Sequence, residues 1–251
     1  MRNSLQWFCF LLVLAQFSCG NSKKENQSEI PESDVAGEQK QPAVTFETVE
    51  TGTFPEASIE MYSPLGNETF REGPVPFEFN IKNYPKHGGN FSFKMSVNGG
   101  EPGSYTTPVF KQQFNSGAYR AVAFLLDRNG LALKEYGNYV DRDFLVGDSR
   151  PFPDSDEPYM ILNLPGDRQV FSPQDTVIVD FLLIGGGLEE DGLKFVLSVD
   201  GEEQDVHELL PIKINNLQPG VHEVQVKLVK NTGEELSGIF STARRTITVE
   251  K

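Results

Sequence analysis

The chain has 251 residues, a formal net charge of −14 at pH 7 and a pI of about 4.7. Hydrophobic residues make up 38% of it, which is enough for a packed core but too little for a polytopic membrane protein. The strong negative charge disfavours nucleic acid as a partner, because such binding depends on Lys and Arg side chains that displace counterions. The length allows one or two domains of ordinary size.

The first residues have the organisation of a signal peptide. Arg2 supplies a positive charge, and residues 5–17 form an apolar run that is too short to remain as a membrane span of about 20 residues. The run ends in Ser18-Cys19-Gly20, which resembles the lipobox of bacterial lipoproteins. The resemblance implies a signal peptide at residues 1–18 and a lipid attached to Cys19 as the mature N-terminus.

The resemblance also implies a location and excludes some chemistry. The mature chain is expected to be exported and membrane-anchored, and Gly20 after the lipidated cysteine favours the outer membrane, on a face that the sequence does not indicate. Cys9 is removed and Cys19 is acylated, so disulfides, thiolate metal sites and a cysteine nucleophile are excluded. The alternative is an ordinary signal peptide with two incidental cysteines.

Residues 19–54 are polar and rich in Glu. Such a segment buries too little apolar surface to offset the entropy of ordering it. We therefore expect a lipidated, flexible, acidic tether.

An internal repeat follows the tether. Phe93–Gly99 (FKMSVNG) returns as Phe195–Gly201 (FVLSVDG), and the shift stays at roughly 101 to 103 residues along the rest of the repeat. Both copies alternate apolar and polar residues with a period of two, and each carries Asn-Gly or Asp-Gly hairpin signals. The sequence predicts repeat 1 at 55–147 and repeat 2 at 158–251.

About seven short strands in each repeat predict an all-β protein with two tandem Ig-like antiparallel β-sandwiches. The pattern resembles the tandem Ig-like or fibronectin-III-like modules of bacterial surface lipoproteins over residues 55–251. No disulfide or core Trp is expected, so Phe and aliphatic side chains should fill both cores.

The segment 148–157 between the repeats is rich in Pro and Asp and should be a semi-rigid connector. Its carboxylates at Asp154, Asp156 and Glu157 are a candidate Ca²⁺ site, because Ca²⁺ prefers several hard oxygen ligands. The alternative is a solvated acidic linker with no metal. No other cofactor is expected.

Apolar residues also fall on the outward side of two predicted strands in repeat 1. If alternate residues of 121–125 face the core, Val122 and Phe124 face outward, and Tyr139 and Leu145 join them on the neighbouring strand. Contiguous exposed apolar surface usually marks an interaction site. The alternatives are that the tether or connector covers this face, or that the strand is flipped.

No nucleophile elbow, P-loop, dinucleotide-binding fingerprint or zinc-protease motif is present, so we expect no enzyme. The sequence favours a non-catalytic binding, adhesion or assembly module of the cell envelope, with a protein or glycan partner besides the membrane. A carbohydrate-binding accessory lipoprotein of a glycan-uptake system is the alternative, because six of the seven tyrosines fall in repeat 1 and can form sugar platforms. They are Tyr62, Tyr84, Tyr105, Tyr119, Tyr136 and Tyr139.

Overall fold

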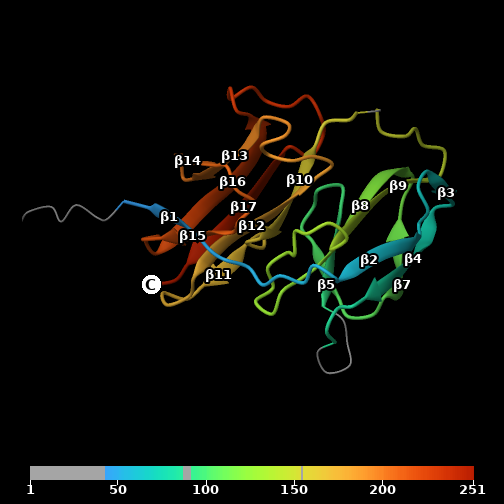
Figure 1. Ribbon diagram of the computed structural model, residues 1–251, viewed down its shortest axis with the longest axis horizontal. Coiled ribbons are helices and arrows are strands. Elements are labelled where there is room, and N and C mark those ends of the chain that lie inside the picture. Colours follow the sequence, from blue (N-terminus) through green and yellow to red (C-terminus); the bar gives the residue numbers. More distant parts are fainter. Residues whose placement is uncertain (1–42, 87–91, 154) are drawn as a thin grey trace, which may run out of the picture. The chain divides into compact units, whose positions relative to one another are not determined.

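Two β-sandwiches of the same topology follow each other along the chain (Figure 1). The computed structural model describes residues 43–86, 92–153 and 155–251, and this part of the chain consists of strands, turns and loops without a helix. The predicted all-β fold with two tandem Ig-like sandwiches is therefore confirmed. Cys19 and the predicted signal peptide lie outside the described residues.

Repeat 1 contains a three-stranded sheet of order β2-β4-β7 and a five-stranded sheet of order β3-β9-β8-β5-β6. All pairs are antiparallel except β3 with β9, which is parallel. The strands are β2 (Ser58–Ser63), β3 (Glu68–Phe70), β4 (Gly73–Lys82), β5 (Phe93–Val97), β6 (Gly103–Tyr105), β7 (Val109–Phe114), β8 (Gly117–Leu125) and β9 (Tyr139–Val146).

Repeat 2 has the same strand order, β10-β12-β15 in one sheet and β11-β17-β16-β13-β14 in the other, with β11 and β17 parallel. The strands are β10 (Tyr159–Leu164), β11 (Gln169–Phe171), β12 (Val177–Ile184), β13 (Leu193–Val199), β14 (Glu202–Val206), β15 (Ile212–Asn215), β16 (Gly220–Lys230) and β17 (Thr242–Val249).

The predicted Asn-Gly and Asp-Gly turns are present in both repeats. Asn98 and Gly99 have φ of 52° and 67°, and Asp200 and Gly201 have φ of 52° and 92°. Positive φ at both central residues is the requirement of a type I′ hairpin, which Gly satisfies without a Cβ clash and Asn or Asp tolerates. These turns fix the register of β5 and of β13 with the next strand.

Phe and aliphatic residues fill each sandwich, as the sequence predicts. In repeat 1, Phe77, Phe93 and Phe144 are fully buried, and the rings of Phe77 and Phe144 meet edge to face at 5.9 Å. In repeat 2, Phe181 and Phe195 are fully buried with their centroids 4.3 Å apart. Burial of each such ring contributes about 1.5–3 kcal/mol, so both repeats have a core of their own.

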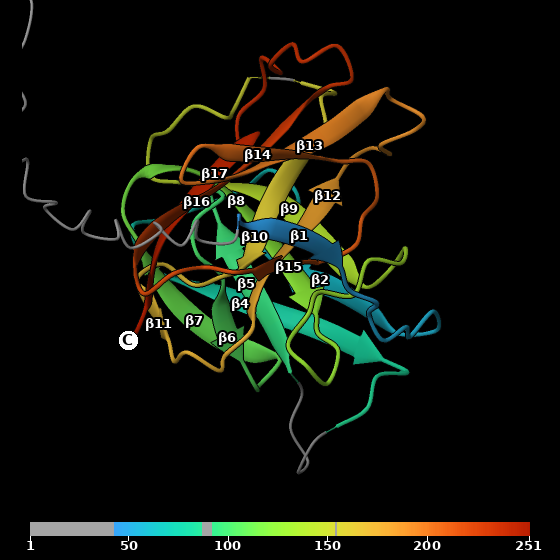
Figure 2. The ribbon, with the colours of Figure 1, turned by 90° about the vertical axis from the view of Figure 1, so that its left-hand side faces the viewer.

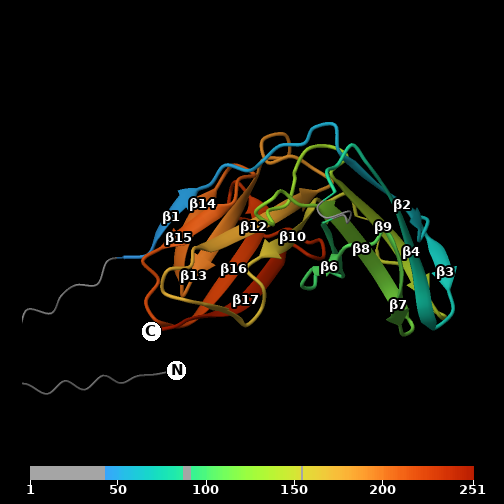
Figure 3. The same ribbon diagram turned by 90° about the horizontal axis from the view of Figure 1, so that it is seen from below.

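The predicted tether ends earlier than residue 54. Strand β1 (Thr45–Thr48) pairs antiparallel with β15 of repeat 2 and extends that sheet to the order β1-β15-β12-β10 (Figures 2 and 3). Val44 and Phe46 pack against the core of repeat 2, and this apolar contact supports the added strand. The prediction of a flexible tether up to residue 54 is corrected here, because the chain is already part of the fold at β1.

Candidate functional site

An apolar cluster joins the two repeats, and the described residues from 43 to 251 belong to one compact unit. Val122 and Phe124 on β8 belong to this cluster, whereas Ala123 between them faces the core of repeat 1. The opposing side chains come from β10 and β12 of repeat 2. The buried members are Val122, Phe124, Leu126, Ala132, Tyr159, Ile161, Leu182 and Ile184.

The four residues of the predicted interaction face therefore differ in their burial and in their contacts. Val122 is 1% exposed and Phe124 is 0% exposed, so the predicted exposure of these two side chains is wrong. Among the described residues, repeat 2 supplies the covering side chains, and neither the connector nor the described end of the predicted tether does so. Tyr139 packs partly against the same cluster, while Leu145 is half-buried and pairs with Ala118.

A buried polar network reinforces this contact. The Asp180 carboxylate on β12 is fully buried and accepts hydrogen bonds from Lys134 Nζ at 2.8 Å, the Ala132 amide at 2.7 Å and Asn163 Nδ2 at 2.6 Å. Asp180 and Asn163 belong to repeat 2, and the other two residues lie between β8 and β9 of repeat 1. A buried carboxylate that lost such partners would be strongly disfavoured, so the network restricts how the repeats can move apart.

Lys94 on β5 extends the network. Its Nζ donates to Asn163 Oδ1 at 2.8 Å, and Asn163 Nδ2 also donates to the Gly130 carbonyl at 3.0 Å. Burial lowers the pKa of the Lys94 ammonium, and the nearby Asp180 charge partly opposes that shift. Repeat 2 is thus hydrogen-bonded to repeat 1 at two separate elements, strand β5 and the segment between β8 and β9.

Beside this contact lies a groove with a volume of about 860 Å³. Its walls come from β2, β8, β9 and the loop before β9 in repeat 1, from the connector, and from β10 and the end of β12 in repeat 2. Such clefts between domains are frequent ligand sites, and the volume lies within the usual range for small-molecule pockets of about 300–1,000 Å³. Three tyrosines line it: Tyr136, Tyr139 and Tyr159.

The floor of the groove is held by paired side chains. Arg120 donates from Nε and Nη2 to the two carboxylate oxygens of Asp143 at 2.6 and 2.7 Å, and its guanidinium lies 4.7 Å from the centroid of the Tyr159 ring. The Tyr159 hydroxyl donates to Asp141 Oδ2 at 3.0 Å. Burial, with the nearby Asp141 charge, raises the pKa of Tyr159, whereas the hydrogen bond to Asp143 raises the pKa of Arg120.

Other groups at the groove are not engaged in this way. Tyr136 is 98% exposed. Within the described part of the chain, neither the Tyr136 hydroxyl nor the Asp156 carboxylate has a hydrogen-bond partner, and the Arg142 guanidinium bonds only the Asp141 carbonyl, at 2.6 Å. Glu157 Oε2 accepts a hydrogen bond from Ser237 at 2.9 Å, and the second Glu157 oxygen has no hydrogen-bond partner among the described residues. The groove therefore offers an aromatic ring, donors and acceptors to a ligand.

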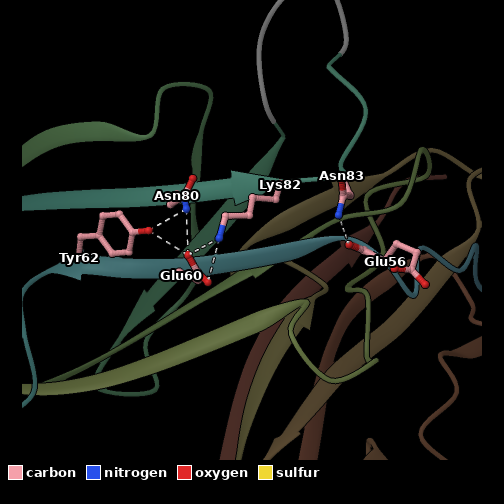
Figure 4. Close-up of polar contacts among 6 residues, drawn as sticks. All are labelled: Glu56, Glu60, Tyr62, Asn80, Lys82 and Asn83. Carbon is pink, nitrogen blue, oxygen red and sulfur yellow. Dashed lines mark hydrogen bonds and ion pairs between the residues drawn. The ribbon is translucent and has the colours of Figure 1, made fainter.

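One rim of the groove carries a hydrogen-bonded cluster on β2 and β4 (Figure 4). The Glu60 carboxylate accepts from Lys82 Nζ at 3.0 Å, Asn80 Nδ2 at 2.9 Å and the Tyr62 hydroxyl at 3.1 Å. These three donors lower the pKa of Glu60, Lys82 most of all, and Glu60 in turn raises the pKa of Lys82. The charge of Glu60 is thus matched by a cation beside it.

The connector carboxylates do not form a recognisable metal centre in the described residues. Asp156 and Glu157 line the groove, while Asp154 lies outside the described residues. No group of three or more His, Cys, Asp or Glu side chains in ranges 43–86, 92–153 and 155–251 is placed to hold a metal ion. A Ca²⁺ site at this connector stays a prediction.

Two features of the sequence are local signals for this site. Asp180 is a lone acidic residue inside the apolar run VIVDFLLI, which is typical of a buried and paired charge. Tyr136 stands beside Gly137, a residue with φ of 92°, in the loop before β9. Residue spacing alone does not reveal that Asp180 bonds the loop between β8 and β9 of repeat 1.

Comparisons with known proteins give no family. No protein-family model matches the sequence, and no curated protein is significantly similar to it. Among solved structures, fibronectin-III-like modules of Clostridium thermocellum CbhA are 18% identical with a TM-score of 0.30, covering 76% of this chain and 94% of that one.

Two further structures are similar at the same level. A central fibronectin-III array of RIM-binding protein is 10% identical with a TM-score of 0.27, covering 77% of this chain and 67% of the other. Three N-terminal domains of the bacteriophage RB49 outer capsid protein Hoc are 10% identical with a TM-score of 0.24, covering 77% and 70%. No helix in the described residues is both long enough and apolar enough to cross a membrane.

Proposed function

We propose that this protein is a non-catalytic binding module of the bacterial cell envelope, anchored through a lipid on Cys19, with the groove between its repeats as the ligand site. The observation that carries the proposal is the buried contact around Phe124 and Asp180. Because this contact fixes the two repeats together, the walls of the groove are preorganised, and a ligand need not pay the entropy of assembling them.

A photo-crosslinking experiment tests the groove as the site. Benzoylphenylalanine replaces Tyr136 in the full lipidated protein, and the cells that make it are irradiated. The matched control places the same residue at Val221, which is 69% exposed on β16 and does not line the groove. We expect adducts from position 136 only. No adduct there, or equal adducts at both positions, contradicts the proposal.

The anchor is tested separately. Cys19→Ser should abolish incorporation of a clickable fatty acid and release the protein from the membrane fraction, because the lipid needs the Cys19 sulfur as its acceptor. Cys9→Ser is the matched control, since residue 9 lies in the segment that is removed. Density-gradient separation of the two membranes then checks the proposed outer-membrane location. Label retained on the Cys19→Ser protein contradicts the lipoprotein proposal.

A carbohydrate-binding accessory lipoprotein of a glycan-uptake system is a narrower version of this function. The observation that favours it is the gathering of three tyrosines at the groove, with Tyr136 presented almost fully to solvent. Deletion of the gene should then slow growth on one glycan while growth on the free monosaccharide is unchanged. Equal growth on every glycan tested contradicts this version alone.

A further inference from the structure

We propose that the groove binds a short uncharged oligosaccharide, with the Tyr136 ring as a stacking platform and Asp141, Arg142 and Tyr139 as its hydrogen-bonding groups. This inference rests on the proposed function, since it names the ligand class of the same site. It depends on three features of the groove: its charge, the way Tyr136 is held, and the polar groups that remain available.

The charge of the groove disfavours an anionic ligand. Arg120 is matched by Asp143 and Glu60 by Lys82, so these pairs leave little net charge. The remaining lining groups are the carboxylates of Asp141, Asp156 and Glu157 and the guanidinium of Arg142, three negative charges against one positive, an excess of two negative charges. The net charge of the whole chain is also negative, at −14. Phosphorylated, sulfated or uronic-acid glycans would therefore be repelled.

Tyr136 is exposed on a turn that the fold holds in place. Asn138, two residues later, is fully buried, and its Nδ2 donates to the Ala57 carbonyl at 2.7 Å. The Asn138 amide also donates to the Glu135 carbonyl at 3.0 Å, and the Ile59 amide of β2 donates to the Gly137 carbonyl at 2.9 Å. The backbone on both sides of Tyr136 is thus held by hydrogen bonds, while the Tyr136 ring is exposed to solvent.

Such a ring suits the C–H face of a sugar. A large aromatic side chain that is left in water costs free energy, and its electron-rich face attracts the weakly positive C–H groups of a pyranose. The turn adds a further advantage, because little backbone entropy is lost when a ligand stacks on a residue that is already positioned.

The polar groups beside the ring have the pattern that vicinal hydroxyls need. Asp141 Oδ2 accepts from Tyr159, which leaves Oδ1 as an acceptor, and Arg142 has guanidinium N–H donors beyond the one that bonds the Asp141 carbonyl. The Tyr139 hydroxyl has no hydrogen-bond partner among the described residues, so it can act as a donor or as an acceptor. Each sugar hydroxyl both donates and accepts, so adjacent acceptors and donors satisfy it better than an aliphatic pocket would.

The test uses the full mature chain carrying Cys19→Ser, so that it is soluble, on an array of neutral and acidic oligosaccharides, followed by calorimetry with the bound neutral ones. Tyr136→Ala should weaken binding at least tenfold, Arg142→Ala should also weaken it, and Tyr136→Phe should retain it because the ring is kept. Leu65→Ala, which truncates an exposed side chain of repeat 1 outside the groove, is the control and should bind normally.

Each outcome decides between the two proposals. Neutral oligosaccharide binding that depends on Tyr136 supports the inference. Binding of acidic glycans only, no glycan binding at all, or binding that Tyr136→Ala leaves unchanged overturns it. A crosslink from position 136 that contains only peptide, together with an empty array, overturns the glycan ligand but leaves the groove as a binding site. Absence of any crosslink there overturns the proposed function itself.

Discussion

The Asp180 carboxylate of repeat 2 bonds the Lys134 ammonium of repeat 1 at 2.8 Å, and both side chains are almost completely shielded from water. Their relative exposures are 0% and 12%. Lys134 Nζ also lies 5.2 Å from the centroid of the Phe181 ring, so a cation of one repeat sits against the core of the other. Because this ion pair is shared between the repeats, the stability of each sandwich depends on the other.

Asp180→Asn should destabilise the protein by about 3–5 kcal/mol, because it leaves the Lys134 charge buried without its counter-ion. Adding Lys134→Met removes that charge, and the double variant should recover about 1–3 kcal/mol relative to the sum of the single changes. Urea unfolding of the unaltered protein, the two single variants and the double variant gives the coupling free energy between residues 180 and 134. If the two single effects simply add, the buried pair does not exist in solution.

Phe124→Ala should cost about 3–5 kcal/mol, the usual effect of truncating a fully buried Phe. The control is Val221→Ala, an exposed apolar truncation in repeat 2 that should change stability by less than about 0.5 kcal/mol. Thermal melts distinguish the two positions. Equal melting temperatures for both variants would mean that Phe124 faces solvent and that repeat 2 does not cover it.

Much of the fold could be predicted because it is local. Hairpin dipeptides such as Asn98-Gly99, the period of two and the internal repeat are all read from neighbouring residues. The pairing of β1 with β15 could not be predicted, since a four-residue strand finds its partner more than 160 residues away in sequence, at Ile212–Asn215. The alternation of Val44 and Phe46 was its only local signal.

The candidate site could be predicted only in part. The alternation along β8 placed Val122 and Phe124 on the side of the sheet away from the core of repeat 1, but it contained no information about what covers them. The groove depends on residues of repeat 1, the connector and repeat 2, such as Tyr136, Glu157 and Tyr159. A site built from several separate segments of the chain has no spacing that a single sequence can show.

Phe46→Ser should loosen β1 from repeat 2, because Phe46 is the aromatic side chain that holds this strand against the core. The side chain is only partly buried, so the loss of stability should stay below about 2 kcal/mol. Hydrogen exchange should accelerate at Ile212–Asn215, whose outer edge β1 covers. Thr45→Ala, an exposed change on the same strand, should leave that exchange unchanged. Fast exchange of β15 already in the unaltered protein would show that β1 is not paired.

Stability should fall at alkaline pH. Burial raises the pKa of Tyr84, Tyr105, Tyr139 and Tyr159 above the ordinary 10.0, so the folded state keeps these protons where the unfolded chain releases them. The stabilisation from a raised pKa is complete below the unfolded value and is lost as pH rises through 10 toward the folded value. The lowered pKa of Lys94 has the opposite effect on stability, but this one group is outnumbered by the four tyrosines.

Urea unfolding at about pH 8 and about pH 11 measures this effect. Tyr159→Phe removes one of the raised groups, so its stability should decline less between the two conditions than that of the unaltered protein. Equal declines in both proteins would mean that Tyr159 titrates normally and is open to solvent.

The distance between the two repeats in solution tests the central claim, that they form one preorganised binding unit, most directly. The mature chain with Cys19→Ser has no other cysteine, so Val109→Cys in repeat 1 and Val221→Cys in repeat 2, both at exposed positions, accept one spin label each. We expect double electron–electron resonance to give a single narrow distance distribution that broadens in Asp180→Asn. A broad or two-peaked distribution in the unaltered background would show that the repeats move independently, and it would contradict the account.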